Sequence, residues 1–302
     1  TAAVVFIGVQ KGIEKASTIL MPILIILIVC ISIFCATRPG ALAGVKYYLL
    51  PDIKHFSATT VLAAMGQLFY SMSLAMGIMI TYGSYMKKED DLRDSVRKIE
   101  IFDTVVALLA GLMIVPSVFA FSGGSKEALS KGPSLMFVTM PKVFNSMKIG
   151  SLIGAGFFIL VLFAALTSAI SLLETNVSII CDKLHWSRKK STVVATLYCL
   201  IVGGLISLGY GPLSFIKIIG MNLLDFFDFI SNSVLMPIVA MLTCIFIGYI
   251  VKPKTIIDEV ELGGKTFKEK KFYVVMLKYV APVCLLLILL FAVSEALGLI
   301  KV

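Results

Sequence analysis

Charge and histidine are scarce in this chain of 302 residues, and their scarcity excludes several classes of protein. Only 15% of the residues are charged and 59% are hydrophobic, so the mean hydropathy of +0.99 lies far outside the range of a soluble domain. With two histidines, the chain has almost nothing from which to build a zinc site or a catalytic triad. The composition therefore predicts a membrane protein that is not an enzyme.

The six cysteines form no pattern typical of disulfides or of a metal site. Five lie inside apolar runs, and Cys181 lies at an expected helix end on the cytoplasmic side. No two are spaced as C-x-x-C. We therefore expect neither an extracellular disulfide nor a cysteine metal site, and the sequence predicts no organic cofactor.

Seven long apolar runs predict seven membrane-spanning helices. Each is near or above the ~20 residues that a helix rising about 1.5 Å per residue needs to cross ~30 Å of hydrocarbon. The apolar first ten residues, which do not begin with methionine, are interpreted as the tail of an eighth helix. We predict an all-α, polytopic membrane protein with one transmembrane domain, 1–302. The runs are 18–35, 59–86, 104–125, 149–173, 191–216, 229–251 and 272–294, the last interrupted only by Lys278.

Basic residues indicate how the chain is oriented. If the runs alternate in direction, four loops share one side, and these loops hold seventeen of the 27 Lys and Arg residues. The positive-inside rule makes this side cytoplasmic in the plasma membrane. The net charge of +9 therefore reflects topology, and we expect no nucleic-acid partner. The basic loops are 11–17, 87–98, 183–190 and 252–271.

The loops on the side opposite the basic loops, and three prolines, allow further predictions. Loop 36–58 has turn residues around a short surface segment, and loop 121–148 is long enough for a short helix; either could be a lid or a plain connector. Pro116 and Pro237 lie deep in their runs and should kink them. Pro22 is expected one turn into its helix, where proline is tolerated.

The second apolar run, with "GQLFYSMSLAMGIMITYGSY" at 66–85, carries small and polar residues at its centre. Ser71, Ser73, Ala75 and Gly77 fall near the expected middle of the bilayer. An irregular backbone at that depth is tolerated only where it is buried in protein or lines a cavity. The alternative is a regular helix whose small residues pack against a neighbour.

Four carboxylates lie within or beside apolar runs. A carboxylate inside a span costs about 2.5–3.5 kcal/mol on insertion scales, so it usually faces a partner or an ion. Asp103 either faces such a partner or reaches water at the cytoplasmic interface. For Glu174, the sequence alone does not indicate which group it would face. Asp225 and Asp228, on one face near the outer edge, suit either an outer gate or an ordinary interfacial position.

The fourth run contains "FAALTSAISLLETN", which places one carbonyl and two hydroxyls on a single helix face. They belong to Ala164, Thr167 and Ser168, at positions i, i+3 and i+4. Uncharged oxygen ligands suit a hard, weakly held cation such as sodium. Alternatively, the hydroxyls donate to carbonyls of the preceding turn, as Ser and Thr commonly do in membrane helices.

These stretches together resemble the neurotransmitter:sodium symporter family, from the end of its fourth helix to its eleventh. "KGIEKASTILMP" resembles the start of the fifth helix, and "GQLFYSMSLAMG" resembles the discontinuous sixth. "FAALTSAIS" resembles the eighth helix, and "DKLHWSRKK" its end with the following loop. The resemblance implies an inverted-repeat sodium-symporter fold whose broken sixth helix binds substrate and ion through free carbonyls and amides.

The resemblance also implies two sodium sites, each completed by the family's first helix, which this chain lacks. The first would use the hydroxyl of Ser71 and the carboxylate of Asp103. The second would use the carbonyl of Ala164 and the hydroxyls of Thr167 and Ser168.

Two positions depart from the common family pattern. Asp103 stands where the family often has Asn, although a subset of bacterial members shares the acid. Ala107, one turn further, stands where chloride-dependent members carry a hydroxyl. A fixed negative charge beside a lost hydroxyl implies chloride independence.

By the same resemblance, the substrate pocket lies on the sixth and eighth helices. Its side chains are mostly apolar, so we expect a hydrophobic or aromatic amino acid whose carboxylate and amine bind backbone groups. Tyr70 would act as a lid, Met76 would adapt its shape, and the methyl of Ala75 would trim the pocket where the family often has glycine. The full set is Tyr70, Ser73, Ala75, Met76, Gly77, Ser168, Ala169 and Leu172.

The resemblance further implies two gates. Gln67 with Asp225 or Asp228 would serve the outer gate, and Tyr85 with Asp182 would serve the inner gate. The arginines of both gates would come from outside this chain.

The sequence thus predicts sodium-coupled uptake of an amino acid by alternating access, with the lipid bilayer as surroundings and no prediction of oligomeric state. A proton-coupled transporter of the same fold, with Asp103 or Glu174 as proton carrier, stays open. A membrane sensor that binds the ligand without coupled transport also stays open. The scarcity of histidine disfavours a membrane enzyme.

Overall fold

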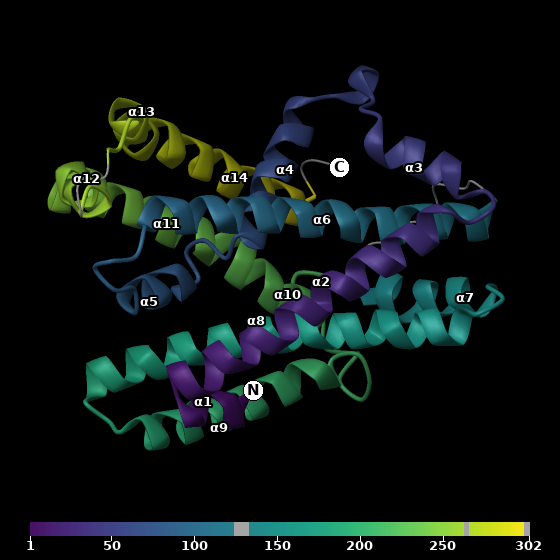
Figure 1. Cartoon of the computed structure of the whole chain (residues 1–302), viewed down its shortest axis with the longest axis horizontal. Coiled ribbons are helices and arrows are strands. Elements are labelled where there is room, and N and C mark those ends of the chain that lie inside the picture. Colours follow the sequence, from purple (N-terminus) through teal and green to yellow (C-terminus); the bar gives the residue numbers. More distant parts are fainter. Residues whose placement is uncertain (124–132, 263–265, 299–302) are drawn as a thin grey trace. The chain divides into compact units, whose positions relative to one another are not determined.

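The computed structural model describes residues 1–123, 133–262 and 266–298, and every named element there is a helix (Figure 1). In these residues, six helices are long and apolar enough to cross a membrane. They are Lys11–Ala36, Leu92–Ser122, Gly150–Leu184, Arg188–Leu208, Leu223–Val251 and Lys270–Ala296. The predicted all-α membrane fold is confirmed, and six of the seven expected spans are continuous. The remaining run, 59–86, which is the second along the chain, forms two helices separated by a non-helical stretch.

The chain divides into two compact units, which are described separately. Unit 1 comprises Thr1–His55 and Glu100–Glu174, and unit 2 comprises Phe56–Ile99 and Thr175–Val302. The boundaries fall inside two long helices, α6 (Leu92–Ser122) and α8 (Gly150–Leu184), so each of these helices contributes to both units. The single domain expected from the sequence stays a prediction.

Unit 1 has its core where one face of α2 (Lys15–Ala36) meets α6, α7 (Met140–Asn145) and α8. Buried residues of α2 recur every three or four positions, which is the spacing of one helix face. A polar contact crosses this core, because the Ser32 hydroxyl donates to the Leu109 carbonyl at 2.7 Å. The buried cluster is Leu24, Ile28, Ile31, Cys35, Met113, Val118, Met140, Val143, Phe144, Phe157 and Leu160.

The other elements of unit 1 are short. The surface segment expected in loop 36–58 is a helix, α3 (Ala41–Leu49), and α7 is the short helix expected in loop 121–148. Residues 124–132 of that loop lie outside the described residues. The remaining elements are α1 (Ala2–Ile7), the π-helical segments Val9–Glu14 and Leu135–Thr139, and the 3₁₀ turn Ile53–His55.

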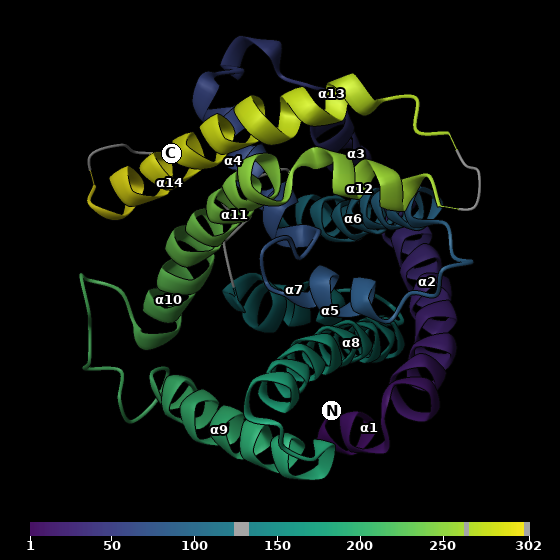
Figure 2. The same ribbon diagram turned by 90° about the vertical axis from the view of Figure 1, so that its left-hand side faces the viewer.

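Unit 2 is organised around α14, against which both α4 and α11 pack (Figure 2). Ser57 caps α4 by a reciprocal pair of hydrogen bonds with Thr60, so the helix begins at a defined residue. The helices are α4 (Ala58–Ser71), α5 (Ile78–Ser84), α9 (Arg188–Leu208), α10 (Leu223–Asp228), α11 (Met236–Ile245), α12 (Pro253–Val260), α13 (Lys270–Val275) and α14 (Ala281–Ala296). The π-helical segments are Phe229–Leu235, Phe246–Val251 and Met276–Val280.

Four prolines lie immediately after π-helical segments. Pro141, Pro237, Pro253 and Pro282 each occupy the first or second position of the α-helix that follows such a segment. Proline donates no N–H, and its ring crowds the carbonyl four residues back. At Pro141, Pro237 and Pro282, where the helix continues, the wider π-helical turn makes room for that ring, whereas Lys252, at φ 71°, ends the helix before Pro253. Hydropathy alone could not predict these local changes.

The expectation for Pro22 was wrong. It lies about two turns inside α2, because α2 begins at Lys15 and follows directly on a π-helical segment. Pro116 lies inside α6 as expected, and it is buried.

Ion pairs join polar stretches of unit 2. Arg93, near the start of α6, contacts Glu269 at 2.6 Å, and both side chains are about half exposed. Lys270 contacts Glu261 at 2.6 Å, and the Phe267 N–H donates to the same carboxylate at 3.0 Å. These two contacts lower the pKa of Glu261. Exposed pairs of this kind hold loop geometry but add little stability.

Gly44→Ala tests how α3 packs on α6. The added Cβ would lie 2.7 Å from Pro116 Cα and 2.9 Å from Phe119 Cβ, so α3 must shift, at an expected cost of about 1–3 kcal/mol. The thermal midpoint of the purified protein should fall by several degrees. Gly203→Ala in α9 is the control, since its added Cβ meets nothing within 4 Å. Equal midpoints for the two variants would contradict the described packing.

Candidate functional site

The second apolar run is broken between α4 and α5, which Figure 1 draws as separate ribbons. Residues 72–77 are not helical, and Ser73, Ala75 and Gly77 take φ values of 54°, 60° and 78°. Residues with a side chain pay about 1–2 kcal/mol in this region, so they adopt it only where the surroundings impose it. The expected irregular backbone is present, and the alternative of a regular helix was wrong.

The break leaves several backbone polar groups without a backbone partner in the part of the chain that the structure describes. The N–H groups of Ser73 and Leu74 still donate to carbonyls in the last turn of α4, at 3.0 and 3.2 Å. Within the described residues, the three N–H groups of 75–77 donate to no backbone carbonyl, and the carbonyls of 72–76 accept from no backbone N–H. Unpaired backbone groups at membrane depth require a polar ligand or water. The break can therefore offer both donors and acceptors to a small polar molecule.

Gly77 joins the break to α5 and touches α8 within unit 2. Its carbonyl accepts the Thr81 N–H at 3.0 Å, which is the first hydrogen bond of α5. A Cβ on Gly77 would lie 2.9 Å from the Cγ2 of Thr175, a buried residue of α8. Thr175 was not identified from the sequence, because no periodic pattern shows which residue of α8 faces the break.

The proposed second sodium site lies on α8 within unit 1. The Thr167 hydroxyl donates to the carbonyls of Phe163 and Ala164, at 3.1 and 3.0 Å. This is the bonding expected from the alternative interpretation of these residues. A donating hydroxyl keeps its lone pairs, so the same oxygen remains able to bind a cation. Ser168, the next residue of α8, is exposed, and the sodium role of this face stays a prediction.

The two side chains assigned to the first sodium site belong to different units. Ser71 is the last residue of α4 in unit 2, and Asp103 is a half-buried residue of α6 in unit 1. Ala107 lies one turn beyond Asp103, and its carbonyl accepts the Tyr48 hydroxyl at 3.3 Å. The expected chloride independence stays a prediction.

Both acids of the expected outer gate are exposed and bonded to nearby amides. Asn222 caps α10 by accepting the Asp225 N–H at 2.9 Å, and its side-chain amide donates to the Asp225 carboxylate at 2.7 Å. Asp228 accepts the side-chain amide of Asn232 at 2.6 Å. Each carboxylate thus has a local structural role, and a role in gating stays a prediction.

The predicted site residues therefore fall into two groups, one in each unit. Unit 2 holds all the residues of the break and every gate residue, whereas unit 1 holds the residues from α6 and from the middle of α8. The unit 2 group is Gln67, Tyr70, Ser71, Ser73, Ala75, Met76, Gly77, Tyr85, Asp182, Asp225 and Asp228. The unit 1 group is Asp103, Ala164, Thr167, Ser168, Ala169 and Leu172.

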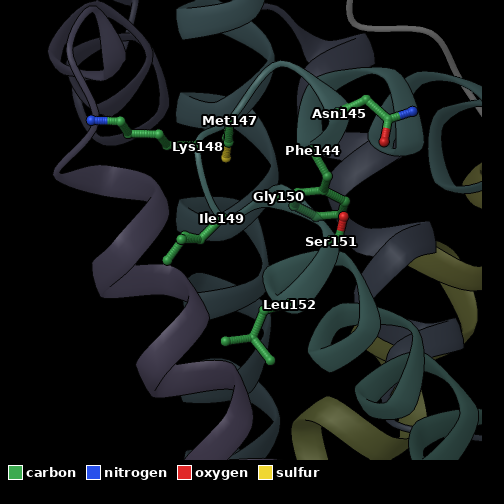
Figure 3. A pocket seen from close by; sticks show the side chains of 8 residues that line it. All are labelled: Phe144, Asn145, Met147, Lys148, Ile149, Gly150, Ser151 and Leu152. Atoms are coloured by element: carbon green, nitrogen blue, oxygen red, sulfur yellow. The ribbon is translucent and has the colours of Figure 1, made fainter.

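A separate hollow of ≈ 290 Å³ lies at the turn between α7 and α8 (Figure 3). No residue assigned above to the substrate, to sodium or to a gate lines it. Its lining is Phe144, Asn145, Met147, Lys148, Ile149, Gly150, Ser151 and Leu152.

Gly77→Ala tests the contact that fixes the end of the break. The thermal midpoint of the variant should fall by several degrees, because the new methyl is strained at φ 78° and collides with the Thr175 methyl. Adding Thr175→Ser removes only that methyl and keeps the hydroxyl, so the double variant should recover part of the loss. Thermal unfolding of the purified protein measures both effects. A double variant no better than Gly77→Ala would show that the Thr175 contact is irrelevant.

Almost the whole chain is similar to known proteins. The model of the Sodium:neurotransmitter symporter family matches residues 1–299. The uncharacterized sodium-dependent transporter YhdH of Bacillus subtilis (strain 168) is 36% identical over 293 residues, which cover 96% of this chain and 64% of the relative. The sodium- and chloride-dependent glycine transporter 1 of Xenopus laevis is 28% identical over 308 residues, covering 97% of this chain and 47% of the relative.

A solved structure is also similar. The crystal structure of MhsT in complex with L-phenylalanine matches with a TM-score of 0.85 and 38% identity, over 96% of this chain and 65% of that chain. This chain thus spans less than two thirds of the length of these proteins. Members of the family are transporters rather than enzymes, in agreement with the expectation from composition. The chain belongs to the sodium:neurotransmitter symporter family.

Proposed function

We propose that this protein couples the entry of sodium to the uptake of an amino acid with a hydrophobic or aromatic side chain. The observation that carries the proposal is the break at 72–77, with N–H and C=O groups that have no backbone partners in the described residues. A free amino acid carries a carboxylate, which needs donors, and an ammonium group, which needs acceptors. A broken membrane helix supplies both within a few residues.

The side chains around the break support an apolar substrate. Tyr70 precedes the unpaired backbone groups and Met76 lies among them, and Leu172 is the largest apolar residue assigned to the pocket from the eighth helix. The thioether of Met76 adapts to different shapes, which suits several apolar side chains. The phenylalanine bound in the structure of MhsT, which is 38% identical to this chain, also supports an aromatic substrate.

Sodium enters this scheme as a co-transported substrate. Ser71 and Asp103 would contribute to one ion site, and the face formed by Ala164, Thr167 and Ser168 would contribute to another. Ion and amino acid raise each other's affinity reciprocally when both stabilise one arrangement of the helices. At an inside-negative potential each entering charge contributes about 2.3 kcal/mol per 100 mV, enough to concentrate a neutral substrate. The names of the relatives, which are sodium-dependent transporters, support this coupling.

The same proposal assigns an orientation in the plasma membrane. The basic loops would face the cytoplasm, so Tyr85 and Asp182 would serve the inner gate. Gln67 with Asp225 or Asp228 would serve the outer one. A gate arginine that reached either acid would share it with the amide of Asn222 or Asn232.

Uptake of labelled phenylalanine by the complete protein in liposomes tests the proposal. We expect accumulation with an inward sodium gradient and none when potassium replaces sodium. Uptake that ignores sodium but follows a proton gradient would instead favour the proton-coupled alternative. Saturable binding without accumulation would favour the sensor.

Asp103→Ala tests the first ion site. The variant loses the only charged ligand assigned to sodium, so the sodium concentration for half-maximal uptake should rise about tenfold or more. Asp94→Ala is the matched control, because Asp94 lies on the same helix and its carboxylate pairs with exposed Lys98 at 2.6 Å. Wild-type sodium dependence in Asp103→Ala would remove this residue from the site.

A further inference from the structure

The connection between α8 and α9 carries charge that the transport scheme does not use. The α8–α9 corner, residues 182–190 with the sequence "DKLHWSRKK", lies at the left end of α8 in Figure 1. It holds four basic side chains against one acid, Asp182. It also holds Trp186, the single tryptophan of this chain.

Contacts between the two helices hold the corner in place. Cys181 of α8 donates its thiol to the Ser191 hydroxyl of α9 at 3.3 Å. Ser191 and Thr192 are buried, with exposed fractions of 0% and 2%. The Thr192 hydroxyl donates to the Arg188 carbonyl at 2.8 Å, within the first turn of α9. The basic residues therefore extend from a packed base.

One cation of the corner lies over an aromatic ring. The Lys190 ammonium lies 3.8 Å from the centroid of the Trp186 ring, within range of a cation–π contact. Lys183, Lys189 and Lys190 are exposed, and Trp186 is half-buried. The arrangement presents cations beside an amphipathic ring.

The length of α9 places the corner at a bilayer surface. Its 21 residues, Arg188–Leu208, rise about 31 Å at 1.5 Å per residue, close to the ~30 Å of hydrocarbon. Arg188 therefore lies at the level where headgroups begin. Tryptophan is enriched at that level in membrane proteins because its ring is amphipathic.

We propose that the α8–α9 corner binds the headgroup of an anionic phospholipid. The phosphodiester lies among Lys183, Lys189 and Lys190, and the Trp186 ring lies beside the glycerol region. Four basic side chains directly at a helix end are the pattern that attracts anionic lipid electrostatically. If the charges served only to orient the chain, no preference among lipids at the corner would follow.

Quenching of Trp186 fluorescence by brominated lipids reads out this contact directly. The complete protein is reconstituted in phosphatidylcholine vesicles that contain brominated phosphatidylglycerol or, at equal mole fraction, brominated phosphatidylcholine. Trp186→Phe supplies the background from any other tryptophan of the complete protein. We expect the quenching of Trp186 to indicate that phosphatidylglycerol binds about threefold or more tightly than phosphatidylcholine. This preference should shrink at 1 M salt, where the Debye length is about 3 Å.

Two charge variants test the assignment to these lysines. The triple variant Lys183→Gln/Lys189→Gln/Lys190→Gln should abolish the preference for phosphatidylglycerol. Because the two lipids are compared within the same variant, any change in the emission of Trp186 cancels. Lys142→Gln/Lys148→Gln/Lys217→Gln removes equal charge near the opposite ends of α8 and α9 and should keep it. Equal quenching by both lipids in the wild type would overturn the proposal. Loss of the preference in millimolar inorganic phosphate would also overturn it, since the corner would then bind free phosphate rather than lipid.

Discussion

Every backbone N–H and C=O group inside a bilayer must find a partner, because an unpaired group in hydrocarbon costs several kcal/mol. The six continuous apolar helices meet this demand internally, and π-helical segments accommodate the prolines in several of them. The break at 72–77 does not meet it, since the N–H groups of 75–77 and the carbonyls of 72–76 have no backbone partner within the described residues, and Ser73 and Ala75 hold strained φ values. Such a backbone persists only if something polar occupies it, and this requirement underlies the assignment of a substrate to this stretch.

The apolar runs predicted the spans well, because length and hydropathy directly reflect the thickness of the bilayer. The break was different, since the small residues of 66–85 suit a tightly packed regular helix equally well. The resemblance to a family with a discontinuous helix resolved that choice. Thr175 could not be predicted, since its contact with Gly77 joins residues far apart in the sequence. The roles of Thr167 also could not be separated, because the same spacing suits a sodium ligand and the hydrogen bonds to Phe163 and Ala164.

The few polar residues of the chain serve two different surroundings along α8. In its middle, Thr167 and Ser168 are uncharged, as suits a dehydrated ion held weakly. At its end, the helix turns through a corner rich in lysine, where full charges remain hydrated and meet lipid headgroups. Glu174, which lies between these two positions of α8 and is fully buried, is the exception, because its carboxylate lies inside the span.

Hydrogen exchange at the break tests the central claim most directly. The complete protein is compared in sodium with and without saturating phenylalanine, and exchange is followed in a peptide that covers 72–77. The account predicts that the amides of 75–77, unpaired within the described residues, exchange about tenfold or more slowly when the amino acid is bound. Unchanged exchange in this peptide, in a preparation that still accumulates phenylalanine, would contradict the claim that the broken backbone binds the substrate.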